Sequence, residues 1–101
     1  MTTGYRLTPQ ASEDIDEIAL YTLERWGLNQ MRRYVTDLVD RFEWLADHPR
    51  AGRDRGDIRP GLQSFTQGTH TVIYRVVDDT MEIVAVVHQS QDIPKHLGSS
   101  K

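Results

Sequence analysis

The 101-residue sequence contains no cysteine, and this absence excludes several kinds of chemistry. Without thiols there is no disulfide framework, no thiolate nucleophile and no thiolate zinc site. The longest apolar run, IVAVV (83–87), is far shorter than the roughly 20 residues of a membrane-spanning helix. The N-terminal residues MTTGYR lack the basic start and apolar stretch of a signal peptide. We therefore expect a cytoplasmic protein that does not contact a membrane.

Motifs for nucleotide, metal and hydrolase chemistry are also missing. There is no GxxxxGK[ST] or GxGxxG phosphate loop and no GxSxG nucleophile elbow. The net charge of −3 argues against a dedicated DNA-binding protein. The histidines show neither HxH nor HxxxH spacing, so the sequence predicts no metal and no cofactor: His48, His70, His88 and His96.

Two helices are predicted in the N-terminal half, after a short strand at residues 5–8. Thr8 followed by Pro9 is typical of a helix start, with threonine as the N-cap. Gly27 is expected to end this helix, and a second helix should follow over about 28–47. The short connection predicts an antiparallel helical hairpin. Apolar residues of the second helix alternate in steps suited to helix packing: Met31, Val35, Leu38, Phe42 and Leu45.

The C-terminal half shows strand patterns. Segments 62–67, 70–77 and 81–88 are rich in β-branched residues and are separated by short turns. Such connections predict an antiparallel meander with the last two strands near its centre. The tail after Asp92 has no clear pattern, and its end is expected to fray. The element order β-α-α-β-β-β therefore indicates an α+β domain, in which the helical hairpin packs on an antiparallel sheet.

The polar segment HQSQD (88–92) directly follows the apolar run 83–87. His88 is the best candidate for a general acid or base, because it ends a buried strand among polar neighbours. On a two-residue period it shares a sheet face with Val84 and Val86. The residues leave two interpretations open: a half-buried histidine bonded to a neighbouring strand or loop, or a catalytic or binding group.

Two other groups of charged residues are candidates for a functional site. Asp14 and Asp16 fall on the first helix, where we expect solvated carboxylates rather than a catalytic pair. Guanidinium groups in the loop 50–61 suit carboxylates and phosphates alike, although two aspartates lie between them. The loop is thus either a solvated network of ion pairs or a contact patch for a partner or nucleic acid. Its four arginines are Arg50, Arg53, Arg55 and Arg59.

Four segments together resemble the ParE-type toxins of the RelE/ParE superfamily. They are YRLTPQASEDIDEIALYTLERWG, LADHPRAGR, LQSFTQGTHTVIYRV and VVHQSQD. The resemblance covers about residues 4–97, so we expect a single toxin domain over 1–101 with its ordered core there. It implies the toxin of a bacterial type II toxin–antitoxin pair, which inhibits DNA gyrase by binding it and is neutralised by a ParD-type antitoxin. Operator DNA would be contacted only indirectly, through the antitoxin.

The same superfamily includes RelE-like nucleases, which cut mRNA on the ribosome and supply the alternative function. Here Arg75 and His88 are the catalytic candidates of that alternative. However, Ala85 stands where many relatives have arginine, and the tail after Asp92 has no tyrosine. This incomplete set favours a binding protein without enzymatic activity. A third alternative is a toxin-derived module that has lost its toxicity and retains only antitoxin binding.

Binding residues follow from this resemblance and from the helix pattern. Leu20 and Leu23 fall outside the core stripe of their helix, which marks either an interface or a broad buried face. An amphipathic antitoxin helix is expected on Leu20, Leu23 and Trp26, and an extended antitoxin segment could pair with an open sheet edge. The expected target-binding residues are Arg53, Arg55, Arg59, His88, Gln91 and Asp92.

Overall fold

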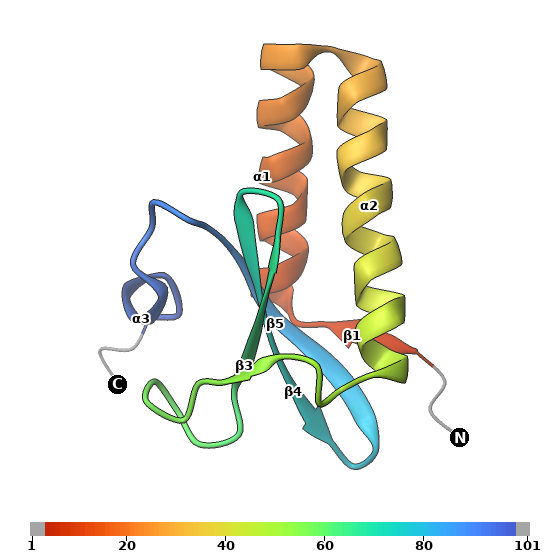
Figure 1. The fold of residues 1–101 in the computed structure, drawn as a ribbon. Helices are drawn as coiled ribbons and strands as arrows, with labels where there is room; N and C mark the ends of the chain where they lie inside the picture. Colours follow the sequence, from red (N-terminus) through yellow and green to blue (C-terminus); the bar gives the residue numbers. More distant parts are fainter. Residues whose placement is uncertain (1–3, 99–101) are drawn as a thin grey trace.

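The computed structural model describes residues 4–98, in which two long helices stand on one side of a twisted sheet (Figure 1). The helices are Pro9–Trp26 (α1), Leu28–Asp47 (α2) and Ile93–His96 (α3). The strands are Tyr5–Leu7 (β1), Arg53–Asp54 (β2), Gln63–Gln67 (β3), His70–Val77 (β4) and Thr80–His88 (β5). The predicted α+β class is confirmed, whereas the expected fraying of the C-terminal end concerns residues outside the described range.

The helical hairpin forms for local reasons, as predicted. The Thr8 side chain accepts a hydrogen bond from the Ala11 amide at 3.0 Å, and Pro9 occupies the first turn of α1. Gly27 has a φ of 94°, which favours glycine, and it alone joins α1 to α2. Its amide donates to the Leu23 carbonyl at 3.0 Å, so the chain reverses within a single residue.

The sheet has the strand order β1-β5-β4-β3-β2. The antiparallel arrangement is confirmed from β2 to β5, but β1 pairs with β5 in parallel, with Tyr5 opposite Met81. No tight turn joins these two strands, so their relative direction was not set by a connection. The short elements β2 and α3 were not predicted from the sequence. β2 forms only by pairing with β3, whereas α3 has a local signal that was missed, with Asp92 as its N-cap and a proline in its first turn.

The sheet separates two apolar cores. The larger one lies beneath α1 and α2 and includes Leu38, Phe42 and Leu45 of the predicted seam, all fully buried. Met31 and Val35 of that seam are only partly buried, because the outer half of the hairpin extends past the sheet (Figure 1). The second core lies on the opposite face, where partly buried residues cover its centre: Ile58, Ile93 and Leu97.

A β-bulge in β5 changes which face each of its residues occupies. Ile73 pairs with Ala85 but Tyr74 pairs with Ile83, so Val84 has no partner in β4. Val86 therefore packs in the core under the helices, whereas Val84 packs against the second core. The expectation that Val84, Val86 and His88 share one face is wrong, because the extra residue shifts the alternation.

Candidate functional site

A cleft of about 500 Å³ lies between the helical hairpin and the end of the sheet that carries the β3–β4 turn. Its α1 wall includes the aromatic side chains of Tyr21 and Trp26. Its polar floor is formed by side chains at the start of β4, at the last residue of β5 and just after it: His70, His88, Ser90 and Gln91. An apolar wall above a floor of hydrogen-bonding groups is typical of a site that binds another molecule.

Tyr34 of α2 fixes the floor of the cleft to the helices. Its hydroxyl lies 2.6 Å from Nδ1 of His70 and 3.2 Å from the carbonyl oxygen of Gln67. The β3–β4 turn passes so close that a Cβ atom on Gly68 would lie 3.0 Å from the Tyr34 hydroxyl. Burial, and then the neighbouring His88, lower the pKa of His70 from its ordinary 6.5 to about 4. His70 is therefore neutral near pH 7.

This shift predicts that acid destabilises the protein through His70. Between pH 6.5 and 4 the unfolded chain binds a proton that folded His70 does not, so the free energy of unfolding should fall as the pH falls. The contribution is at most about 3 kcal/mol and is fully present above pH 6.5. Urea unfolding of the wild type and of His70→Gln at several pH values measures it. An equal pH slope in both proteins would contradict the assignment.

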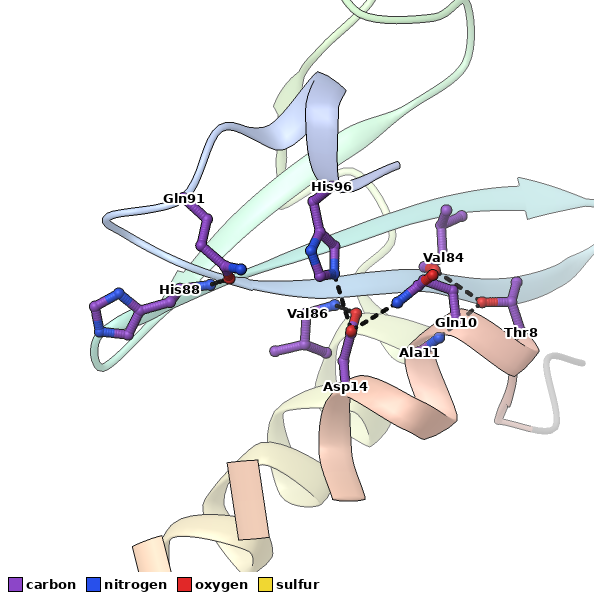
Figure 2. Close-up of polar contacts among 9 residues, drawn as sticks. All are labelled: Thr8, Gln10, Ala11, Asp14, Val84, Val86, His88, Gln91 and His96. Carbon is purple, nitrogen blue, oxygen red and sulfur yellow. Dashed lines mark hydrogen bonds and ion pairs between the residues drawn. The ribbon is translucent and has the colours of Figure 1, made fainter. Parts of the chain in front are cut away.

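His88 lies directly opposite His70 in the β4–β5 register, and the two imidazole rings meet edge to face with centroids 5.2 Å apart. Nδ1 of His88 accepts a hydrogen bond from the Ser90 amide at 3.1 Å and lies 2.7 Å from the Ser90 hydroxyl. The His88 amide donates to Oε1 of Gln91 at 3.0 Å (Figure 2). The segment after β5 thus folds back and holds His88 at the floor of the cleft.

Asp14, a residue that sequence reasoning misplaced, anchors β5 next to this floor. β1 pairs with β5 only as far as Ile83, and side chains meet the backbone groups beyond it. Thr8 donates to the Val84 carbonyl at 2.7 Å, and the Val86 amide donates to Oδ2 of Asp14 at 2.9 Å (Figure 2). These contacts protect part of an exposed strand edge.

The expectation that Asp14 is solvated is wrong, since its side chain is only 3% exposed. Its Oδ1 also accepts hydrogen bonds from Gln10 and from Nε2 of His96, both at 2.9 Å. The contact with His96 fastens α3 to α1. A signal was present in the sequence: Asp14 lies three residues after Ala11 and four before Ile18, on the buried stripe of α1.

The arginine loop lies away from the cleft. Arg55 forms an ion pair with Asp57 at 3.1 Å, and Nη2 of Arg59 donates to the Leu97 carbonyl at 3.4 Å. Arg53 is exposed on β2, which pairs with the part of β3 remote from its turn. Asp92 caps α3 by accepting a hydrogen bond from the Lys95 amide at 3.0 Å. Of the six residues expected to bind the target, the structure therefore brings only His88 and Gln91 into the cleft.

The structure does not bring the two nuclease candidates together. Arg75 lies opposite Glu82 and forms an ion pair with it at 2.7 Å, whereas His88 lies six residues further along β5. At strand spacing this is roughly 20 Å. Arg75, and then Arg6, lower the pKa of the Glu82 carboxyl by hydrogen bonding to it. Within residues 4–98, no group of three or more His, Asp and Glu side chains is placed to hold a metal ion.

Exposed apolar side chains gather on the outer half of the hairpin. Leu20, Leu23 and Trp26 are 56%, 38% and 66% exposed, so they do not belong to a broad buried face. Trp26 also lines the cleft, and Leu20 and Leu23 lie outside it. Sequence reasoning missed Tyr21, which is 60% exposed and lines the cleft beside Trp26. In the described part of the chain, no helix has the length and apolarity to cross a membrane.

Comparisons with known proteins agree with this architecture. The family described as "ParE toxin of type II toxin-antitoxin system, parDE" matches residues 5–93. The chain is 37% identical to "Toxin ParE1" of Mycobacterium tuberculosis over 98 residues, which cover 96% of this chain and 100% of the relative. It is 38% identical to "Toxin ParE1" of Caulobacter vibrioides over 94 residues, covering 93% and 97%.

A solved structure titled "Chromosomal ParDE TA system from P. aeruginosa" has the same fold, with a TM-score of 0.73. The match covers 85% of this chain and 95% of that one at 20% identity, which is a likeness of fold alone. The family match and the two relatives establish the family as well as the fold, because they extend over nearly the whole sequence. The chain belongs to the ParE family of toxins of type II toxin–antitoxin systems.

Proposed function

We propose that this toxin acts by binding DNA gyrase, and that a ParD-type antitoxin neutralises it by covering the outer half of the helical hairpin. Such a target also places the toxin in the cytoplasm. The observation that carries the proposal is the exposed apolar surface of α1 beside the cleft, formed by Leu20, Tyr21, Leu23 and Trp26. These four residues are called the hairpin surface below, and exposed apolar side chains that gather on one part of a surface mark interaction sites.

The chemistry of the hairpin surface fits an amphipathic partner helix. Burying a large apolar side chain contributes about 1.5–3 kcal/mol, and tryptophan and tyrosine are frequent anchors of protein interfaces. Tyr21 and Trp26 face the cleft, so a helix lying along α1 can contact apolar and polar groups together. This supports the expected antitoxin site at Leu20, Leu23 and Trp26 and adds Tyr21 to it.

Two features support binding rather than catalysis by the free toxin. The ion pair between Arg75 and Glu82 leaves that guanidinium partly neutralised and far from His88. His88 itself is engaged through Nδ1 and its amide with the segment that follows β5. A phosphodiester cleavage site needs a base, an acid and a cation around one phosphate. The described residues do not assemble these three groups from the candidates that the sequence offered.

Replacing Leu23 with glutamate should weaken antitoxin binding about 100-fold while leaving the fold intact, because a charge would be buried against the partner. Val76→Glu is a matched control, since Val76 is 46% exposed and lies at the far end of β4. Calorimetry with the antitoxin measures the affinity, and circular dichroism checks the fold. Equal affinity of wild type and Leu23→Glu would rule out this placement.

The target is tested by inducing this chain alone in a sensitive bacterium and assaying purified gyrase beside it. Blocked supercoiling or accumulated cleaved DNA, with bulk mRNA intact, is the expected result. Cleavage of ribosome-bound mRNA with gyrase unaffected would instead establish the nuclease alternative, and His88→Ala should then abolish the cleavage. Normal growth on induction would show that the chain is not toxic, and antitoxin binding in the calorimetry above would then identify it as a module that only binds the antitoxin.

A further inference from the structure

The charged groups around the cleft are of one sign. Among the side chains that line it, only Glu17 carries a carboxylate, and none is a lysine or an arginine. Glu17 lies exposed on α1, and none of the ion pairs within residues 4–98 includes it. The carboxylate of Asp14 also lies near enough to the floor to favour the charged form of His70. A group that enters the cleft therefore meets negative charge that no lining lysine or arginine neutralises.

The two imidazoles of the floor add no positive charge in this arrangement. His70 is neutral near pH 7, because burial and then the neighbouring His88 lower its pKa to about 4. The Tyr34 hydroxyl donates to the Gln67 carbonyl, so Nδ1 of His70 donates to that hydroxyl and its Nε2 is an acceptor. Nδ1 of His88 accepts the Ser90 amide, which an imidazolium cannot do, because both of its nitrogens carry protons. The floor therefore leaves the charge of Glu17 uncompensated.

The α1 wall places aromatic rings next to this carboxylate. Tyr21 lies one helical turn after Glu17 on the same face, and Trp26 follows five residues later, roughly 7.5 Å further along the helix axis. The guanidinium of Arg25 lies 5.8 Å from the centroid of the Tyr21 ring, so this wall already attracts a cation of the toxin itself. Trp26 is 66% exposed and takes part in none of the cation–π contacts of the described residues. A carboxylate and two rings thus lie in a row along one wall.

We propose that this row, which we call the cation strip (Glu17, Tyr21 and Trp26), binds a lysine or arginine side chain of the antitoxin segment that occupies the cleft. The inference rests on the proposed function, because it assigns a specific contact to the neutralising partner. The aliphatic stem of such a side chain can pack on the two rings while its charged end reaches the carboxylate. Tyrosine and tryptophan faces attract cations, and charge-assisted hydrogen bonds are about twice as strong as neutral ones.

A basic side chain suits the cleft better than an apolar or acidic one. An antitoxin segment that covers the α1 wall removes water from Glu17, and a carboxylate that loses water without gaining a partner costs free energy. An apolar side chain leaves that cost in place. An acidic side chain adds repulsion from Glu17 and Asp14. A lysine or arginine instead supplies the cation that the lining residues lack.

Calorimetry of the full chain with its ParD-type antitoxin tests the proposal. Glu17→Gln keeps the size of the side chain and removes its charge, so it should weaken binding about 10-fold at low salt. The difference from the wild type should shrink at about 1 M salt, because ions screen the contact. Asp16→Asn is the matched control, since it removes the same charge from the neighbouring position of α1, which is exposed and outside the cleft. Circular dichroism checks the fold of both variants.

Charge reversal identifies the antitoxin residue. Glu17→Lys should weaken binding about 100-fold, and changing one lysine or arginine of the antitoxin to glutamate should restore most of the lost affinity. If Glu17→Gln binds like the wild type at low salt while Leu23→Glu still weakens binding, the cation strip is wrong and the antitoxin site stands. If no basic residue of the antitoxin couples to Glu17, another side chain occupies the cleft and the inference fails. If the wild type binds no antitoxin, the proposed function fails and the inference fails with it.

Discussion

Replacing Asp14 with alanine is expected to lower the free energy of unfolding by about 3–4 kcal/mol. The carboxylate is 3% exposed and accepts hydrogen bonds from three groups, one of them the Val86 amide on the outer edge of β5. Its loss leaves that amide buried without a partner and releases His96 from α1. The destabilisation should therefore appear both in the strand edge and in the attachment of α3.

Urea unfolding compares Asp14→Ala with two controls. Asp16→Ala removes an exposed carboxylate from the same helix and should change stability by less than about 0.5 kcal/mol. Asp14→Asn keeps one oxygen for the Val86 amide but presents N–H groups to His96, so an intermediate loss is expected. Hydrogen exchange of the Val86 amide should accelerate in Asp14→Ala. A stability within 1 kcal/mol of the wild type would show that water replaces the carboxylate without penalty.

Replacing Gly52 with alanine is expected to cost about 3 kcal/mol, because the added methyl group has no room. A Cβ atom there would lie 2.2 Å from the hydroxyl oxygen of Tyr74, and 2.9 Å from the carbonyl oxygen of Ser64. Tyr74 cannot move aside, since its side chain is fully buried and its hydroxyl donates to the Pro49 carbonyl at 2.9 Å. The Gly52 amide in turn donates to the Tyr74 hydroxyl at 2.9 Å.

A double-mutant cycle identifies the cause of this loss. Tyr74→Phe removes the nearest clashing atom, so Gly52→Ala should cost less in the Tyr74→Phe background than in the wild type. Gly56→Ala is the control, because a Cβ there meets only the side chain of Asp54, which is exposed, at 3.2 Å. Equal costs in both backgrounds would place the clash at the Ser64 backbone. A neutral Gly52→Ala would show that the segment after α2 shifts freely.

The hairpin surface is formed by a single helix, whereas the cleft depends on how several elements pack together. The hairpin surface belongs to α1, whose ends are set by Thr8 and Gly27. The floor of the cleft depends on sheet register, on the β3–β4 turn and on the segment after β5. Binding of a partner that contacts both surfaces therefore depends on how α2 packs on the sheet. The contact of Tyr34 with His70 maintains that packing.

The helical hairpin and the central strands were predictable because their signals are local. A threonine before a proline starts α1, one glycine ends it, and short turns force β3, β4 and β5 into an antiparallel meander. The same reasoning placed Leu20 and Leu23 off the core stripe, but it left open whether they were exposed, and the structure decided that they are. These conclusions need only the chain within a few residues of each position.

Three features that escaped prediction involve contacts between segments well separated in the sequence. Asp14 is buried because it meets Val86 and His96, which are 72 and 82 residues away. The bulge at Val84 reverses the alternation of β5, and no pattern of apolar residues within the strand reveals it. Arg75 and His88 share a pair of strands, but the register places them at opposite ends.

The sequence by itself determined the helices, the three central strands and the apolar stripe of the hairpin, because propensity, capping and periodicity act over one or two turns of chain. Only the tertiary structure decided that His70 and His88 meet. They are 18 residues apart, and strand register and the contact with Tyr34 bring their rings together. Hydrogen bonds made after β5 then determine which atoms of the floor stay available, and that choice gives the cleft its chemistry.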